Sequence, residues 1–145
     1  QMLIDNEINL LDICEKEDLT LTTANIAPLS HWITPEFEAR RFDTRFFIAY
    51  LPENQIVQHD GMELTHSLWI SPNLALKKAL EGEMQMILPT TENLKSCMDF
   101  KSATTMLDHQ KKLTKDDIKP ILPKFYKEND TWKVLFPGDD GYEDH

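Results

Sequence analysis

The stretch T-R-F-F-I-A-Y-L at residues 44–51 constrains the fold more than any other part of the sequence. It is almost entirely apolar and aromatic, with charged residues before it and Pro52 after it, a pattern typical of a β-strand. Apolar residues fall on both faces, which predicts a central strand covered on both sides. At 145 residues, the chain is long enough to bury a sizeable core around such a strand. We expect a single domain of the α/β (α+β) class.

The rest of the chain alternates between helix and strand patterns. The pair Ser71-Pro72 is a typical helix start, because serine caps the first turn and proline fits the first helical position. Residues 137–145 are acidic and are expected to be loose. Together the patterns predict helices at 3–13, 71–82, 89–100 and 102–113, strands at 26–34 and 65–70, and a hairpin of 121–126 with 131–136 turning at 128–130.

All three arginines of the protein lie within residues 31–47. An arginine side chain presents a planar fork that matches two oxygens of a carboxylate or phosphate, which lysine cannot do. One interpretation is an anion-binding segment formed by Arg40, Arg41 and Arg45. The other is a bend braced by ion pairs with nearby carboxylates, since surface ion pairs are common and contribute little stability. The sequence leaves both interpretations open.

The charge balance limits the possible partners. A formal net charge of −10 and a pI near 4.8 argue against nonspecific binding to nucleic acid or to anionic membranes, which requires a basic face. No apolar run approaches the length of about 18 residues expected of a membrane span. Cys14 and Cys97 lack metal-binding or CxxC spacing and read as free thiols, so a reducing compartment such as the cytoplasm is expected.

No self-contained catalytic motif is present. GxxxxGK[ST], GxGxxG, GxSxG and HExxH are all absent from the sequence, and its five histidines show no metal-ligand spacing. An acidic loop with Asp60 and Glu63 lies between two predicted strands, where functional groups are often found. A carboxylate there could bind a hard cation such as Mg²⁺. The alternative is an ordinary solvated turn.

Six short motifs occur in an order that resembles one enzyme family. They are W-I-T-P (32–35), R-R-F-D-T-R-F-F (40–47), W-I-S-P-x-x-A-L (69–76), L-P-T-T-x-x-L (88–94), I-K-P-I-L-P (118–123) and L-F-P-G-D-D-G-Y (135–142). This order resembles the C-terminal part of a Nudix hydrolase. It is most similar to the branch that includes peroxisomal coenzyme A diphosphatases and related bacterial proteins. The block at 40–47 is the most specific part.

The resemblance implies an α/β/α sandwich whose mixed sheet contains residues 44–51 and 65–70. It also implies cleavage of the diphosphate bond in a nucleoside diphosphate derivative, possibly one like coenzyme A, with Mg²⁺ or Mn²⁺. Glu63 matches a loop glutamate that assists the metal or the attacking water, so it is the implied catalytic and metal-binding residue. Arg40, Arg41 and Arg45 are the implied substrate-binding residues.

One defining motif of that family is missing from these residues. The Nudix box, G-x5-E-x7-R-E-U-x-E-E-x-G-U, supplies the metal-binding glutamates, and the pattern does not occur in the sequence. We therefore expect the box on an upstream segment and no activity from this chain alone. Residues 1–19 would be a helical insertion, 20–136 the fold core with its following helices, and 137–145 an acidic tail.

Such an arrangement would leave sheet edges exposed, and an upstream segment, a second chain or a homodimer partner should cover them. Two alternatives to the enzyme remain open at this point. One is a non-catalytic binding or interaction module derived from a Nudix fold. The other is an unrelated acidic interaction domain.

Overall fold

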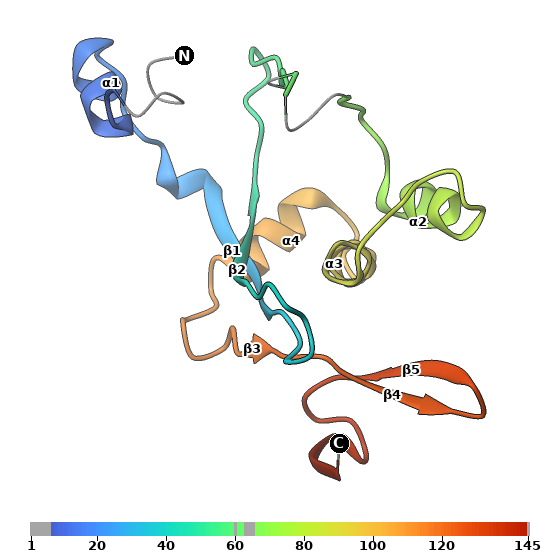
Figure 1. Ribbon diagram of the computed structural model, residues 1–145. Helices are drawn as coiled ribbons and strands as arrows, with labels where there is room; N and C mark the ends of the chain where they lie inside the picture. Colours follow the sequence, from blue (N-terminus) through green and yellow to red (C-terminus); the bar gives the residue numbers. More distant parts are fainter. Residues whose placement is uncertain (1–6, 60, 63–65, 145) are drawn as a thin grey trace.

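The computed structural model describes residues 7–59, 61–62 and 66–144, and its fold is of the predicted α+β class. A three-stranded sheet has the order β2 (Asp43–Ala49), β1 (Ile26–Ile33), β3 (Pro120–Ile121), and β4 (Lys124–Glu128) pairs with β5 (Thr131–Leu135) in a separate hairpin. Helices α3 (Leu88–Cys97) and α4 (Ala103–Gln110) lie close to β1 (Figure 1). This combination of helices with a small mixed sheet is compatible with the Nudix-like fold that the resemblance implies.

Strand β1 (Ile26–Ile33) is the centre of the sheet. It pairs antiparallel with β2 (Asp43–Ala49) and parallel with β3 (Pro120–Ile121). The prediction that residues 44–51 form a central strand is therefore wrong for the described part of the chain, where β2 is an edge strand. Its two faces differ in exposure, because Phe46 is half-buried while the neighbouring Phe47 is exposed. The apolar run at 44–51 therefore includes side-chain surface that the described residues do not cover.

Trp32 on β1 is the largest buried hydrophobic side chain among the described residues, with 4% of its surface exposed. Its ring meets the edge of Phe136 at a centroid distance of 6.1 Å. The indole Nε1–H donates to Ser30 Oγ (3.0 Å), which donates in turn to Asn93 Oδ1 (2.6 Å) on α3 (Leu88–Cys97). The contact between Trp32 and Phe136 thus attaches the C-terminal region to the sheet, and the hydrogen bonds through Ser30 attach α3.

The predicted starts of two helices are confirmed. Helix α2 (Pro72–Leu80) has Ser71 as its N-cap, whose hydroxyl accepts from the Leu74 amide. Helix α4 (Ala103–Gln110) begins with a reciprocal cap between Ser102 and Thr105. These caps satisfy amide groups that have no partner within the helix. The structure thereby confirms what the sequence indicates locally.

The predicted N-terminal helix is displaced. Helix α1 spans Leu10–Lys16, not 3–13, and residues 1–6 lie outside the described part of the chain. Asn9 starts the helix through a capping box with Asp12, since each side chain accepts from the other residue's amide (3.0 and 2.9 Å). Apolar periodicity does not reveal this cap, so the predicted helix begins several residues too early.

The prediction of a strand at 65–70 is wrong for those of its residues that the structure describes. Thr65 lies outside the described residues, and residues 66–70 have no regular secondary structure. Trp69 is 79% exposed. Strand preference depends on packing against a neighbouring strand more than on the backbone itself. The described chain offers this segment no such neighbour.

The predicted hairpin is confirmed at its turn and corrected at one end. Strands β4 (Lys124–Glu128) and β5 (Thr131–Leu135) flank Asn129 and Asp130, which have φ angles of 47° and 62°. Two successive positive φ angles are typical of a type I′ turn, which asparagine and aspartate tolerate. The predicted strand 121–126 is divided between β3 and β4, because Pro123 lacks the amide needed to continue a ladder.

The acidic end is docked, contrary to the prediction that it is loose. Tyr142, in the short 3₁₀ helix Tyr142–Asp144, is buried, and its hydroxyl donates to the Leu122 carbonyl (2.8 Å). The Lys124 ammonium donates to the Tyr142 carbonyl (2.8 Å) and lies 4.1 Å from the centre of its ring. One aromatic anchor outweighs the repulsion among the flanking carboxylates.

Alkaline pH is expected to release this anchor. Burial, with the nearby charges of Glu143 and Glu36, raises the pKa of Tyr142 above its usual value of about 10. Because the neutral phenol is the buried form, its contribution to stability is complete below the usual pKa and is lost as pH rises through the raised pKa. Absorbance titration should show a tyrosine component that ionises above the usual pKa, and this late component should be missing in Tyr142→Phe. A late component that persists in the variant contradicts the assignment.

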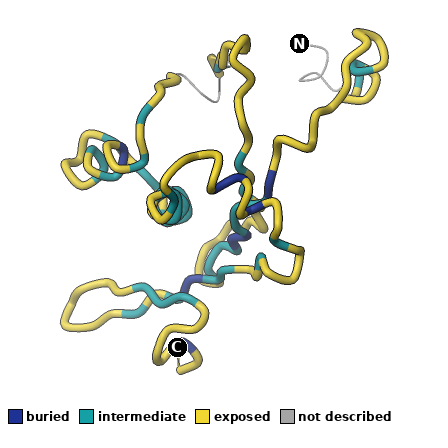
Figure 2. Tube along the Cα trace, turned by 180° about the vertical axis from the view of Figure 1, so that it is seen from behind, coloured by how far each residue is buried: buried dark blue, intermediate teal, exposed yellow. Residues whose placement is uncertain are grey.

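The chain leaves an unusually large surface open to solvent (Figure 2). Its accessible surface is 11967 Å², whereas a compact monomer of this mass exposes about 7,700 Å². Elements project in several directions from the β1–β2 pair (Figure 1). Many large apolar side chains are exposed, among them Phe37, Phe42, Phe47, Ile56, Met62, Trp69, Leu80 and Trp132. None of the described helices has the length and hydropathy needed to cross a membrane.

Candidate functional site

Three polar side chains meet on one face of the β1–β2 pair. The antiparallel register places His31 opposite Arg45, and Asp43 lies two residues before Arg45 on β2. Asp43 Oδ1 is 2.6 Å from His31 Nε2 and 3.2 Å from Arg45 Nη1. Because a carboxylate can only accept, the Nε2 atom carries the proton in this pair. His31 is buried, whereas the Arg45 side chain remains 58% exposed and keeps donors directed to solvent.

Arg40 and Arg41 belong to the loop between β1 and β2. The Arg41 Nε–H donates to the Thr34 carbonyl (3.0 Å), and Thr34 also exchanges hydrogen bonds with Phe42. The Arg40 guanidinium carbon lies 4.9 Å from the centre of the Phe42 ring. These contacts close and brace the loop. The structure does not gather the three arginines into one site, and Arg45 alone of them lines the cavity described next.

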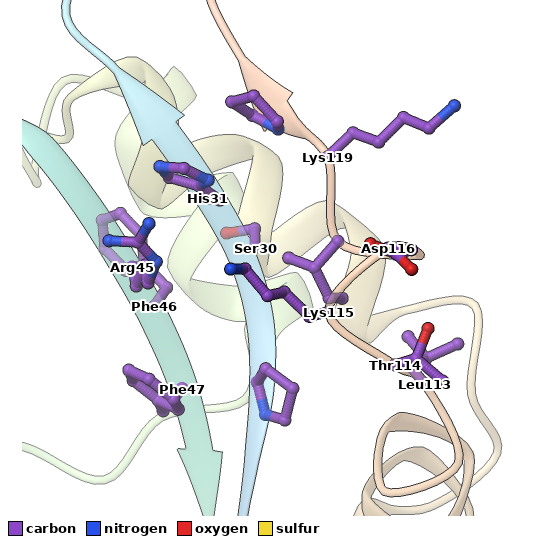
Figure 3. A pocket seen from close by; sticks show the side chains of 13 residues that line it. Ser30, His31, Arg45, Phe46, Phe47, Leu113, Thr114, Lys115, Asp116 and Lys119 are labelled. Atoms are coloured by element: carbon purple, nitrogen blue, oxygen red, sulfur yellow. The ribbon is translucent and has the colours of Figure 1, made fainter.

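A cavity of about 640 Å³ lies between β1, β2 and the segment that leads from α4 to β3 (Figure 3). Arg45 lines it from β2, and Lys115 lines it from residues 113–120. Cavities of this size commonly hold small molecules. The sequence interpretation overlooked this segment. A usable signal was present, since four of the twelve lysines lie within residues 111–119.

Glu63, the predicted catalytic and metal-binding residue, lies outside the described residues, as does Asp60. Within the part of the chain that the structure describes, no group of three or more histidine, cysteine, aspartate or glutamate side chains is placed to hold a metal ion. His31 and Asp43 are only a pair. The described residues therefore do not fit the Mg²⁺ or Mn²⁺ site that the resemblance implies.

Of the two cysteines, both of which are described, Cys97 offers no activated nucleophile. Both are free, and Cys97 donates its thiol hydrogen to the Asn93 carbonyl (3.1 Å). Burial raises the pKa of the Cys97 thiol. A catalytic thiol requires the opposite shift, because the thiolate is the reactive form. The structure thus favours a structural role for Cys97 in α3.

Comparison with known proteins shows a distant similarity to an enzyme. The chain is 27% identical to the human acyl-coenzyme A diphosphatase NUDT19 over 136 residues, which cover 92% of this chain and 36% of that protein. It therefore spans about a third of the length of the curated relative it matches. No family model and no solved structure matches the chain. This distant similarity agrees with the resemblance noted in the sequence motifs and extends over most of the chain.

Proposed function

We propose that this chain is the C-terminal part of a Nudix-type hydrolase that cleaves the diphosphate bond of a nucleoside diphosphate derivative of the coenzyme A kind. The observation that carries the proposal is the similarity to an acyl-coenzyme A diphosphatase along 92% of the chain. The motif order across residues 32–142 supports it independently of overall identity. In this proposal residues 20–136 belong to one domain with the missing catalytic segment, and residues 1–19 are an insertion.

The catalytic metal ions are assigned to another part of the polypeptide. The Nudix box pattern does not occur in these 145 residues, and the described residues bring together no metal-binding cluster. Glu63 is the one residue of this chain that we propose to join that site. Of the three arginines, Arg45 is the best placed to bind a substrate phosphate, because Arg40 and Arg41 already brace their loop. The free thiols favour a reducing compartment such as the cytoplasm.

We assign the uncovered surface to contact with the upstream segment of the same polypeptide. The accessible surface exceeds that of a compact monomer by about 4,000 Å², about five times the roughly 800 Å² that one partner buries in a standard protein interface. Within the described chain, the outer edge of β2 has no strand partner, and large apolar side chains such as Trp69 and Leu80 are exposed. Free strand edges and apolar faces of this kind are normally covered in a finished domain.

The test compares a polypeptide that joins the upstream segment to these residues with residues 1–145 alone. With Mg²⁺ or Mn²⁺, the longer polypeptide should convert coenzyme A into a phosphopantetheine product and a nucleotide, which chromatography separates. The shorter one should release neither. Intact substrate with the longer polypeptide would contradict the proposal. Saturable substrate binding without product would favour the alternative, a non-catalytic binding module. The observation that supports this alternative is the cavity lined by cations within this chain.

A further inference from the structure

The cavity between β1, β2 and residues 113–120 has a wall that the chain holds in place at both ends. At one end, β3 pairs with β1 through His31 and Pro120. At the other, the amide and hydroxyl of Thr114 both donate to Asp117 Oδ2 (2.7 Å each). These hydrogen bonds lower the pKa of Asp117, so this carboxylate stays charged and bonded within its own loop. The wall is therefore fixed before any ligand binds.

Three cations, Arg45, Lys115 and Lys119, and one carboxylate, Asp116, line the cavity, so its charged lining is positive on balance. Figure 3 shows the Lys115 side chain extending toward the two strands, while Asp116 and Lys119 extend away from them. No ion pair joins Lys115 to any other described residue. Arg45 uses one of its five N–H donors on Asp43, which leaves donors for a ligand. Two cations thus face one space in a chain with a net charge of −10.

The remaining lining is mainly apolar. Pro28, Phe47 and Ile118 supply apolar walls beside the two cations. The hydroxyl of Ser30 is already used, because it bonds to Asn93 and to Trp32. Phe47 is 58% exposed, so its ring offers a free face for stacking. An ion without an organic part would leave these surfaces unused.

We propose that this cavity binds a phosphate monoester with an aromatic or aliphatic body. Its phosphate lies between Arg45 and Lys115, and its body packs on Phe47 and Ile118. The inference rests on the proposed function for the identity of the natural ligand, since such a group would be the nucleotide portion of the substrate. Binding itself requires neither the metal ions nor turnover. It can therefore be tested separately from hydrolysis.

The test uses the full polypeptide that contains these residues, freed of divalent metal, with adenosine 5′-monophosphate as the probe in calorimetry. Adenosine and inorganic phosphate represent the two halves of the probe. The monophosphate should bind saturably and at least about tenfold more tightly than either half, because only it uses both the cations and the apolar wall. Lys115→Ala should weaken the monophosphate about tenfold and leave adenosine nearly unchanged.

Phe47→Ala should show the reverse pattern, weakening the monophosphate about tenfold and leaving inorganic phosphate nearly unchanged. Lys112→Ala is the matched control, since it removes the same charge from a nearby exposed position that does not line the cavity. Equal losses in Lys112→Ala and Lys115→Ala would overturn the proposal in favour of a general charge effect. Absence of saturable binding in the full polypeptide would also overturn it, because another segment would then occupy the cavity.

Discussion

Trp32→Ala is expected to lower the free energy of unfolding by about 3–5 kcal/mol, the cost typical of removing a buried aromatic ring. The ring is 4% exposed and packs edge-on against Phe136. Its removal leaves a cavity at the centre of the sheet and removes the indole N–H that donates to Ser30 Oγ. Urea unfolding of the full polypeptide, followed by circular dichroism, measures the loss.

Two further variants serve as comparisons. One keeps an aromatic ring at position 32, and the other removes a tryptophan side chain that is not buried. Trp32→Phe keeps one aromatic ring but removes the N–H donor and part of the buried volume, so a loss of about 1–3 kcal/mol, smaller than in Trp32→Ala, is expected. Trp132→Ala removes the same side chain from the β4–β5 hairpin, where it is 68% exposed, and should cost less than about 0.5 kcal/mol. Equal stability of the Trp32→Ala variant and the parent protein would show that β1 is not the centre of the core.

The features best predicted from the sequence are those that depend on a few neighbouring residues. Ser71-Pro72 and the Ser102 region mark helix starts because the capping groups lie within three residues of the amides they satisfy. Asn129 and Asp130 mark a hairpin turn because their side chains tolerate positive φ. In each case the physical cause is local and can be read from the sequence.

Features that depend on distant partners were predicted less well. Residues 44–51 look like a central strand, yet the described chain places β1 at the centre. The apolar residues of 65–70 suggest a strand, yet residues 66–70 have no regular secondary structure. Both errors have the same cause. Apolar side chains predict that a neighbouring element covers them, but no such element is present among the described residues. Tyr142 shows the converse, because its contacts with Leu122 and Lys124 fix a segment of strongly polar composition.

In the arginine-rich segment at 31–47, an ion pair with a carboxylate is seen for Arg45 and Asp43, whereas anion binding stays a prediction. Arg40 and Arg41 contact an aromatic ring and a backbone carbonyl of their own loop, which agrees with bracing. Arg45 also has a carboxylate partner in Asp43, but its side chain lines the cavity beside Lys115. Residue type alone could not distinguish these roles, since the distinction depends on strand register and on a loop about 70 residues later.

Glu63→Gln is expected to lower kcat of the full hydrolase by about 100-fold or more, the usual contribution of a positioned general base or metal-assisting carboxylate. The substitution keeps the size of the side chain and removes its charge and basicity. The expectation rests on the position that the Nudix resemblance assigns to Glu63, which lies outside the described residues. Product release from coenzyme A at saturating substrate, over a series of Mg²⁺ concentrations, measures the effect.

Glu53→Gln is the matched control, because it makes the same chemical change at an exposed position between β2 and α2. Its kcat should stay within about twofold of the parent enzyme, as expected for a surface substitution with no role in the reaction. If Glu63 assists the metal, the Mg²⁺ concentration needed for half-maximal rate should also rise in Glu63→Gln alone, since one oxygen ligand loses its charge. Unchanged kcat and unchanged Mg²⁺ dependence in Glu63→Gln would remove this residue from the site and leave Arg45 as the one residue of this chain proposed to contact the substrate phosphate.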